Sequence, residues 1–78
     1  MKVRVELTSY ATDEAVTLQK TFDWSNGPHA GDGIVPAPGW AVMEPRWVAY
    51  GPGDECFVRI IQPLEADELA GLREAGWA

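Results

Sequence analysis

The segment 25–39, SNGPHAGDGIVPAPG, constrains this chain more than any other feature, because neither a helix nor a sheet interior tolerates its composition. It holds four of the eight glycines, three of the six prolines and the only histidine. Glycine loses much backbone freedom in a regular element, and proline lacks the N–H that a helix or ladder needs. The regular elements must therefore lie before Ser25 and after Gly39. A connection this long is usually either functional or disordered.

The length of 78 residues predicts one domain, covering 1–78, with only a few kcal/mol of net stability. The single cysteine, Cys56, cannot form an internal disulfide, and no Cys/His cluster offers a structural zinc site. The core must therefore stabilise the fold by itself or with help from self-association. Because 46% of the residues are hydrophobic, we expect a folded globule rather than a disordered chain.

Strands are predicted first. Alternation of apolar and polar residues is typical of half-buried strands, and it occurs in 2–8 and again in 15–24. The run 40–50, WAVMEPRWVAY, is a third strand in which Pro45 implies an edge position or a bulge. The turn residues 51–54, GPGD, then precede a fourth strand at 55–61, so the two form a hairpin.

The period changes at the C-terminus, where a helix is predicted over 66–75. Glu65 is a weak N-cap, and Glu68 stands where a capping box would place it. Gly76 is typical of the left-handed residue that ends a helix, with Trp77 positioned to pack back on Leu72. The apolar stripe of this helix is narrow, so we expect it to lie against the sheet.

These elements predict a mainly β or α+β fold, a four- to five-stranded antiparallel meander with one C-terminal α-helix. The pattern resembles a small SH3-like barrel or curled sheet over residues 15–61. The residues that carry the resemblance are Gly31-Asp32-Gly33, Trp40-x-Val42, Trp47-Val48-x-Tyr50 and Cys56-x-Val58-x-Ile60. The compactness, the acidity and the ending LREAGW are also similar to small accessory proteins of phages and of GC-rich bacteria. That resemblance implies a binder or inhibitor rather than an enzyme.

The charge narrows the range of partners. Twelve acidic and six basic residues give a net charge of −6, which opposes direct binding to nucleic acid and favours a partner with a basic surface. The alternative is that the acidic residues simply keep a small protein soluble. No segment approaches the roughly 20 apolar residues of a membrane span. We expect a cytoplasmic protein, acting in the host cytoplasm if a phage encodes it.

No catalytic or cofactor signature is present. His29 with Cys56 could form a base and nucleophile only if the fold joined them, and the alternation around Cys56 favours a small buried residue instead. His29 and Asp32 lack the spaced ligand partners of a metal site. The glycines of the loop do not have phosphate-loop spacing. We therefore expect no enzyme activity, no metal and no cofactor.

The aromatic residues give the strongest functional signal, because tryptophan and tyrosine are enriched at binding hot spots. If Val42 and Val48 are buried, then Met43, Pro45 and Trp47 form an exposed apolar stripe. Core packing of the tryptophans is the alternative. We also expect the loop to be a partner surface that the fold does not need. The candidate partner-binding residues are Trp24, His29, Asp32, Trp40, Met43, Trp47 and Tyr50.

Three classes of function follow. The first is an inhibitor or adaptor that acts on a protein partner, with an anti-defence role in a phage as one form of it. The second is capture of a nucleotide or other small molecule at a subunit interface, by aromatic stacking with Arg46 or Arg59 on phosphate. The third is a structural or assembly component. Homo-oligomers are compatible with all three.

Overall fold

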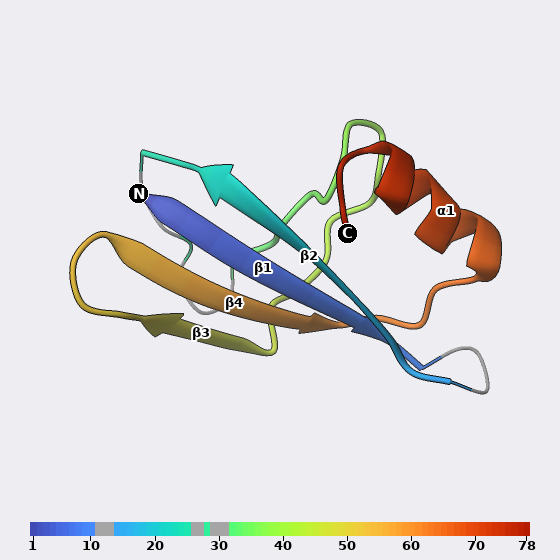
Figure 1. Cartoon of the computed structure of the whole chain (residues 1–78), viewed down its shortest axis with the longest axis horizontal. Helices are drawn as coiled ribbons and strands as arrows, with labels where there is room; N and C mark the ends of the chain where they lie inside the picture. The colour runs from blue at the N-terminus through green and yellow to red at the C-terminus, as the bar shows by residue number, and fades with distance from the viewer. Residues whose placement is uncertain (11–13, 26–27, 29–31) are drawn as a thin grey trace.

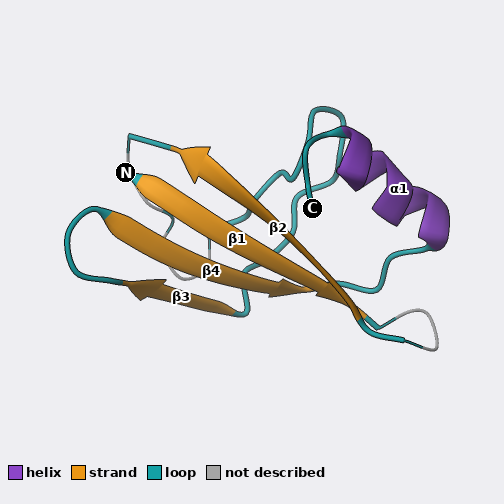
Figure 2. Ribbon diagram, viewed as in Figure 1, coloured by secondary structure: helices purple, strands orange, loops and turns teal. Residues whose placement is uncertain are grey.

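The computed structural model describes residues 1–10, 14–25, 28 and 32–78, and these contain one sheet and one helix. His29 and parts of the predicted loop lie outside the described residues. The strands and the helix match the predicted order, as Figures 1 and 2 show. The elements are β1 (Lys2–Ser9), β2 (Val16–Asp23), β3 (Trp47–Tyr50), β4 (Glu55–Ile61) and α1 (Ala66–Glu74).

The sheet is mixed, so the predicted antiparallel meander is wrong. The spatial order is β2-β1-β4-β3, and β1 runs parallel to β4 while both outer pairs are antiparallel. The chain leaves β2 at one edge, crosses one face of the sheet and enters β3 at the other edge (Figure 1). β4 then inserts between β3 and β1. The sheet stays open, and the predicted barrel closure does not occur.

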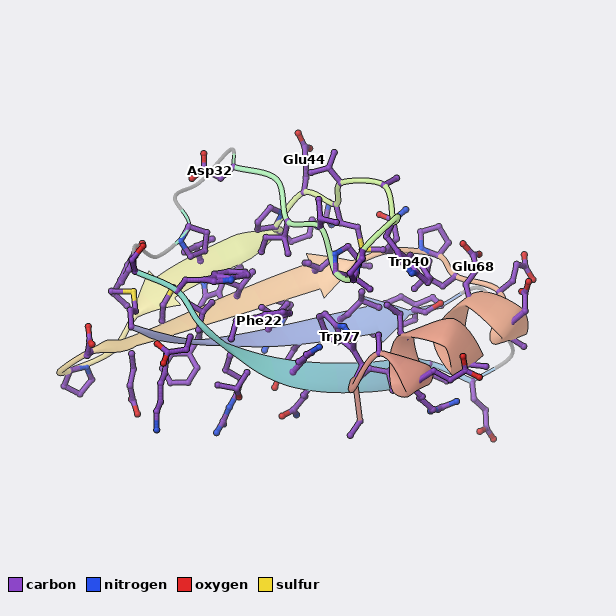
Figure 3. All side chains as sticks on the ribbon, turned by 90° about the horizontal axis from the view of Figure 1, so that it is seen from above. Phe22, Asp32, Trp40, Glu44, Glu68 and Trp77 are labelled. Carbon is purple, nitrogen blue, oxygen red and sulfur yellow. The ribbon has the colours of Figure 1, made fainter. Side chains whose placement is uncertain are left out.

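One face of the sheet carries the hydrophobic core, and this explains why β4 lies beside β1. The alternating apolar residues of the two strands come into register, for example Val5 beside Val58 and Leu7 beside Ile60. The connection after β2 and the helix cover this face, so the molecule has two layers (Figure 3). Apart from alanine and proline, the buried hydrophobic residues in the described part of the chain are Val3, Val5, Leu7, Leu18, Ile34, Met43, Cys56, Val58, Ile60, Leu64, Leu69, Leu72 and Trp77.

The described part of the loop belongs to this core, contrary to the expectation that the fold does not need it. Ile34, Pro36 and Ala37 are buried. The indole Nε1 of Trp77 donates a hydrogen bond of 3.0 Å to the carbonyl oxygen of Pro36. A segment that supplies buried side chains and receives a buried hydrogen bond acts as a lid over the sheet.

The predicted strand 40–50 is shortened to Trp47–Tyr50. Its first part forms only an isolated bridge, in which the backbones of Ile34 and Met43 exchange two hydrogen bonds of 2.7 Å each. This bridge turns Met43 inward, to 5% exposure, and leaves Val42 63% exposed. The predicted exposed stripe is therefore wrong for Met43, because Val42 is not buried.

Proline 45 precedes an edge strand, as the sequence predicts. The N–H of Arg46 donates to the carbonyl oxygen of Arg59 at 2.7 Å, although Arg59 is the ladder partner of Trp47. Two residues of one strand thus face one of the other, as in a β-bulge. The predicted hairpin is also confirmed, and in its register Trp47 lies opposite Arg59 and Tyr50 opposite Cys56.

The helix ends are built as predicted. The side chain of Glu68 accepts a hydrogen bond of 3.0 Å from the N–H of Glu65, which satisfies one free donor of the first turn. Gly76 has φ of 101°, and the N–H groups of Gly76 and Trp77 donate to the carbonyls of Arg73 and Leu72. This is the bonding of a Schellman motif. It directs Trp77 into the core.

Candidate functional site

The structure separates the predicted partner-binding residues into different environments. Trp24 is half-buried and stacks on Phe22, with ring centroids 4.7 Å apart, and Phe22 in turn meets Trp77 edge-on at 5.9 Å. The ring of Trp40 lies against the helix, since a Cβ at Gly71 would be 3.5 Å from its Cζ2 atom. These tryptophans pack against the core layer, as the packing alternative had it.

The predicted residues on β3 are the exposed ones. The side chain of Trp47 is 52% exposed and that of Tyr50 is 50% exposed. Asp32 is also exposed, and Figure 3 shows it on the outer side of the loop, away from the sheet. Trp47 and Tyr50 are therefore two predicted partner-binding residues that are exposed on the same strand.

Trp47 lies on the open face of the sheet, the face opposite the core. In register next to it is Arg59, whose guanidinium carbon is 5.5 Å from the centroid of the Trp47 ring. Arg59 also approaches Glu6, at 3.7 Å between Nη2 and Oε2. The pair is exposed and adds little stability. Its effect is to hold the guanidinium against the indole ring.

A shallow groove of about 310 Å³ extends from Trp47 across the open face. It crosses from β3 over β4 to β1, because these strands are neighbours in the sheet. The groove combines aromatic rings with charged groups of both signs. Its lining residues are Arg4, Glu6, Trp47, Phe57, Val58 and Arg59.

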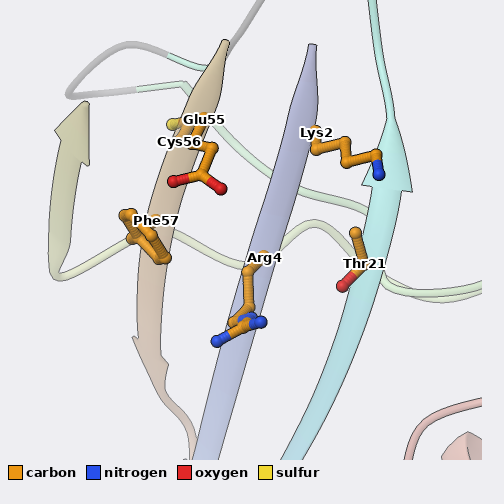
Figure 4. Close-up of a pocket in the computed structure, with 6 residues that line it drawn as sticks. All are labelled: Lys2, Arg4, Thr21, Glu55, Cys56 and Phe57. Carbon is orange, nitrogen blue, oxygen red and sulfur yellow. The ribbon is translucent and has the colours of Figure 1, made fainter. Parts of the chain in front are cut away.

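The open face carries charges of both signs. Lys2, Arg4 and Arg59 lie there together with Glu6 and Glu55 at strand positions that alternate with buried residues, and Asp23 is the ladder partner of Lys2. Next to the groove is a small hollow of about 70 Å³ between β1, β2 and β4, lined among others by Lys2, Arg4 and Thr21 (Figure 4). This volume is well below the roughly 300 Å³ of a small-molecule pocket. The hollow could hold a single charged group at most.

A second groove, of about 360 Å³, lies in the covering layer between the loop and the start of the helix. Trp40 and Met43 contribute to it, together with Leu64 and Glu68. The carboxylate of Glu68 is already bonded to the helix N-terminus. This groove thus joins two of the predicted residues, but it does not include Trp47 or Tyr50.

The environment of Cys56 does not favour a reactive thiol. The side chain is 1% exposed, and burial raises the pKa of the thiol, while a hydrogen bond with Tyr50 partly lowers it. Desolvation also raises the pKa of the Tyr50 hydroxyl, and the neighbouring Cys56 adds to the effect. Reactive cysteines need the opposite shift. Among the described residues no group of three metal-binding side chains comes together.

Sequence reasoning missed Arg4, Glu6 and Phe57, and it considered Arg59 only as a phosphate ligand in the alternative of nucleotide capture. The strand alternation does indicate that these side chains lie on the face opposite the core, because each of them alternates with buried residues in its strand. However, these residues become neighbours only through the parallel pairing of β1 with β4, and the local sequence does not predict that pairing.

The chain contains no helix, among the described residues, that is long and apolar enough to cross a membrane. In comparisons with known proteins, no family model, no curated protein and no solved structure matches the chain. Its function must therefore be argued from the geometry of the open face and of β3.

Proposed function

We propose that this protein is a non-enzymatic binding module, an inhibitor or adaptor, that engages a protein partner with the surface around Trp47. The observation that carries the proposal is the exposed indole of Trp47 with the Arg59 guanidinium stacked on it, at the end of a groove on the sheet face opposite the core, which no described segment covers. Tryptophan and arginine, together with tyrosine, are the residue types enriched at binding hot spots.

The other three tryptophans support this choice by contrast. Trp77 is buried, Trp24 stacks on Phe22, and Trp40 lies against the helix. Each has a packing role, whereas the exposed half of the Trp47 ring has none. The groove of about 310 Å³ is at the lower limit of small-molecule pockets, and because it lies open on a sheet face with charges of both signs, it suits the surface of another protein better than a small ligand. A phage accessory protein acting in a host cytoplasm is one setting for such a module.

The test is affinity capture from the source organism with three forms of the protein as bait: the wild type, Trp47→Ala and Tyr10→Ala. Tyr10 is a matched control, since its side chain is 61% exposed and it follows β1 outside the sheet. The captured partner is then purified, and its affinity for each form is measured by titration calorimetry.

We expect Trp47→Ala to weaken binding about thirty-fold, which corresponds to a hot spot of about 2 kcal/mol. Tyr10→Ala should leave the affinity unchanged. A Trp47→Ala protein that folds and keeps wild-type affinity would show that the partner binds elsewhere, and the groove lined by Trp40 and Met43 would be the next surface to examine.

A further inference from the structure

The outer edge of β3 presents backbone groups that pair with no backbone group of the described residues. β3 is the last strand of the sheet and pairs only with β4. The N–H of Gly51 donates to the carbonyl of Glu55 at 3.1 Å, which marks these two residues as a hydrogen-bonded pair. Hydrogen-bonded pairs alternate along an antiparallel ladder. The N–H and C=O groups of Val48 and Tyr50 consequently point away from β4, and none of them has a backbone partner in the described part of the chain.

The opposite edge of the sheet is treated differently. There Gln19 of β2 exchanges two backbone hydrogen bonds with Ala78, of 2.8 and 3.0 Å. The side chain of Lys20 adds a bond of 2.5 Å to the carbonyl of Ala75. Proteins usually protect edge strands with a covering segment, a charge or a proline. β3, with the sequence WVAY, contains neither a charge nor a proline.

The two exposed aromatic side chains of β3 flank this edge, one on each face of the sheet. Trp47 lies on the open face beside Arg59, whereas Tyr50 lies on the covered side opposite Cys56. The Tyr50 hydroxyl donates a bond of 2.6 Å to the carbonyl of Pro28, which fixes the ring at the edge. A partner resting on the open face would reach only Trp47. A segment that lies along the edge contacts both exposed rings.

We propose that an extended segment of the protein partner binds as a fifth strand along the free edge of β3. This inference rests on the proposed function and specifies how the partner is bound. The backbone of the segment pairs with Val48 and Tyr50, and its alternate side chains contact Trp47 on one face and Tyr50 on the other. Strand addition is a common way to bind peptides, with affinity from main-chain hydrogen bonds and specificity from alternate side chains. The groove on the open face continues from the same edge.

The test uses Val48→Pro, which removes one outward N–H without breaking a bond to β4. Ala49→Pro is its counterpart, because the N–H of Ala49 faces β4 and its loss should lower stability instead. A displayed library of random linear peptides is selected on the wild-type protein, and one enriched peptide is synthesised. Its affinity for wild type and for Val48→Pro is measured, and amide hydrogen exchange is followed with and without the peptide.

We expect Val48→Pro to bind the peptide at least ten-fold more weakly while the protein remains folded. Bound peptide should slow exchange at the amides of Val48 and Tyr50, whereas the amide of Ala49 should be slow already in the free protein. The exchange measurement decides the question even if Val48→Pro fails to fold.

Equal affinity of wild type and Val48→Pro, unchanged exchange at Val48 and Tyr50, or failure to enrich any linear peptide would overturn the proposal. A doubled solution mass with protected Val48 and Tyr50 amides in the free protein would overturn it too, because the occupant would then be a second copy of the chain. If the captured partner loses affinity for Trp47→Ala but not for Val48→Pro, the proposed function stands and strand addition fails. If both variants keep full affinity, both proposals fail.

Discussion

At the scale of single residues, Cys56 and Tyr50 link the core to the candidate edge. The pKa of each side chain is raised in the folded protein, with loss of hydration as the largest cause. The ordinary pKa of a cysteine thiol is near 9.0. Between that value and the higher folded pKa, the native state holds the proton more tightly, so the stabilisation present below about pH 9 is lost as pH rises through the folded pKa.

We therefore predict that the free energy of unfolding of the wild type falls as pH rises above about 9. Urea unfolding between pH 7 and pH 10.5 measures it. In Cys56→Ala, the free energy of unfolding should be lower at every pH because the side chain is smaller, but it should fall less between pH 7 and pH 10.5. In Tyr50→Phe, the fall should be smaller near pH 10.5. If the wild type and both variants have parallel profiles, these two groups do not control alkaline stability.

Burial of single residues was predictable wherever the strand alternation continued without a break. The prediction that Cys56 is a small buried residue is confirmed. The prediction that Met43 is exposed was wrong. The bridge to Ile34, and not the neighbouring strand, turns the Met43 side chain inward. A side chain in an irregular segment takes its direction from a contact that is distant in sequence, and periodicity carries no information about it.

At the scale of elements, the helix is the part that the sequence determines most completely. Its caps and its ending depend on neighbours a few residues apart, so local patterns are sufficient. The same holds for the hairpin of β3 and β4, which the turn 51–54 specifies. The parallel pair of β1 and β4 differs, because its two strands are far apart in the chain and no turn joins them.

Gly71 within the helix and Gly76 just after it should respond in opposite ways to substitution. Gly76 has a left-handed φ of 101°, so Gly76→Val should lower the free energy of unfolding by about 1 kcal/mol or more. Gly71 lies inside the helix, and a Cβ there would make an ordinary contact with Trp40 at 3.5 Å. Gly71→Ala should therefore raise the free energy of unfolding by roughly 0.5–1 kcal/mol, because alanine loses less backbone freedom. Urea unfolding of both variants tests this, and a stabilising Gly76→Val would contradict the observed cap.

At the scale of the whole molecule, the covering layer and the sheet have different roles. The loop and the helix exclude water from one face of the sheet, and the other face with its free edge remains accessible. The composition of the loop predicted a non-regular segment correctly. It did not reveal the lid, because a buried loop has the same glycines and prolines as an exposed one. What decides between them is the placement of Ile34 and Pro36 over the sheet.

Trp77 joins these layers, and its substitution tests the two-layer arrangement. The ring is buried among core residues, and its Nε1 atom bonds to the carbonyl of Pro36 in the loop. Trp77→Ala should cost about 3–5 kcal/mol, as for other buried aromatic residues. A domain of this size has about that much net stability, so the variant should be largely unfolded at room temperature.

Trp77→Phe separates the two contributions, because it keeps most of the apolar ring and loses the hydrogen bond. Since the carbonyl of Pro36 would remain buried without its partner, we expect a loss of about 1–3 kcal/mol and a folded protein. Circular dichroism and urea unfolding measure both variants. If the loop were a detachable partner surface, Trp77→Phe would cost only the buried volume that the smaller ring leaves empty, since water would satisfy the Pro36 carbonyl. A loss beyond that volume cost would mean that the lid is closed in solution and that binding surfaces must be sought on the uncovered side, where Trp47 lies.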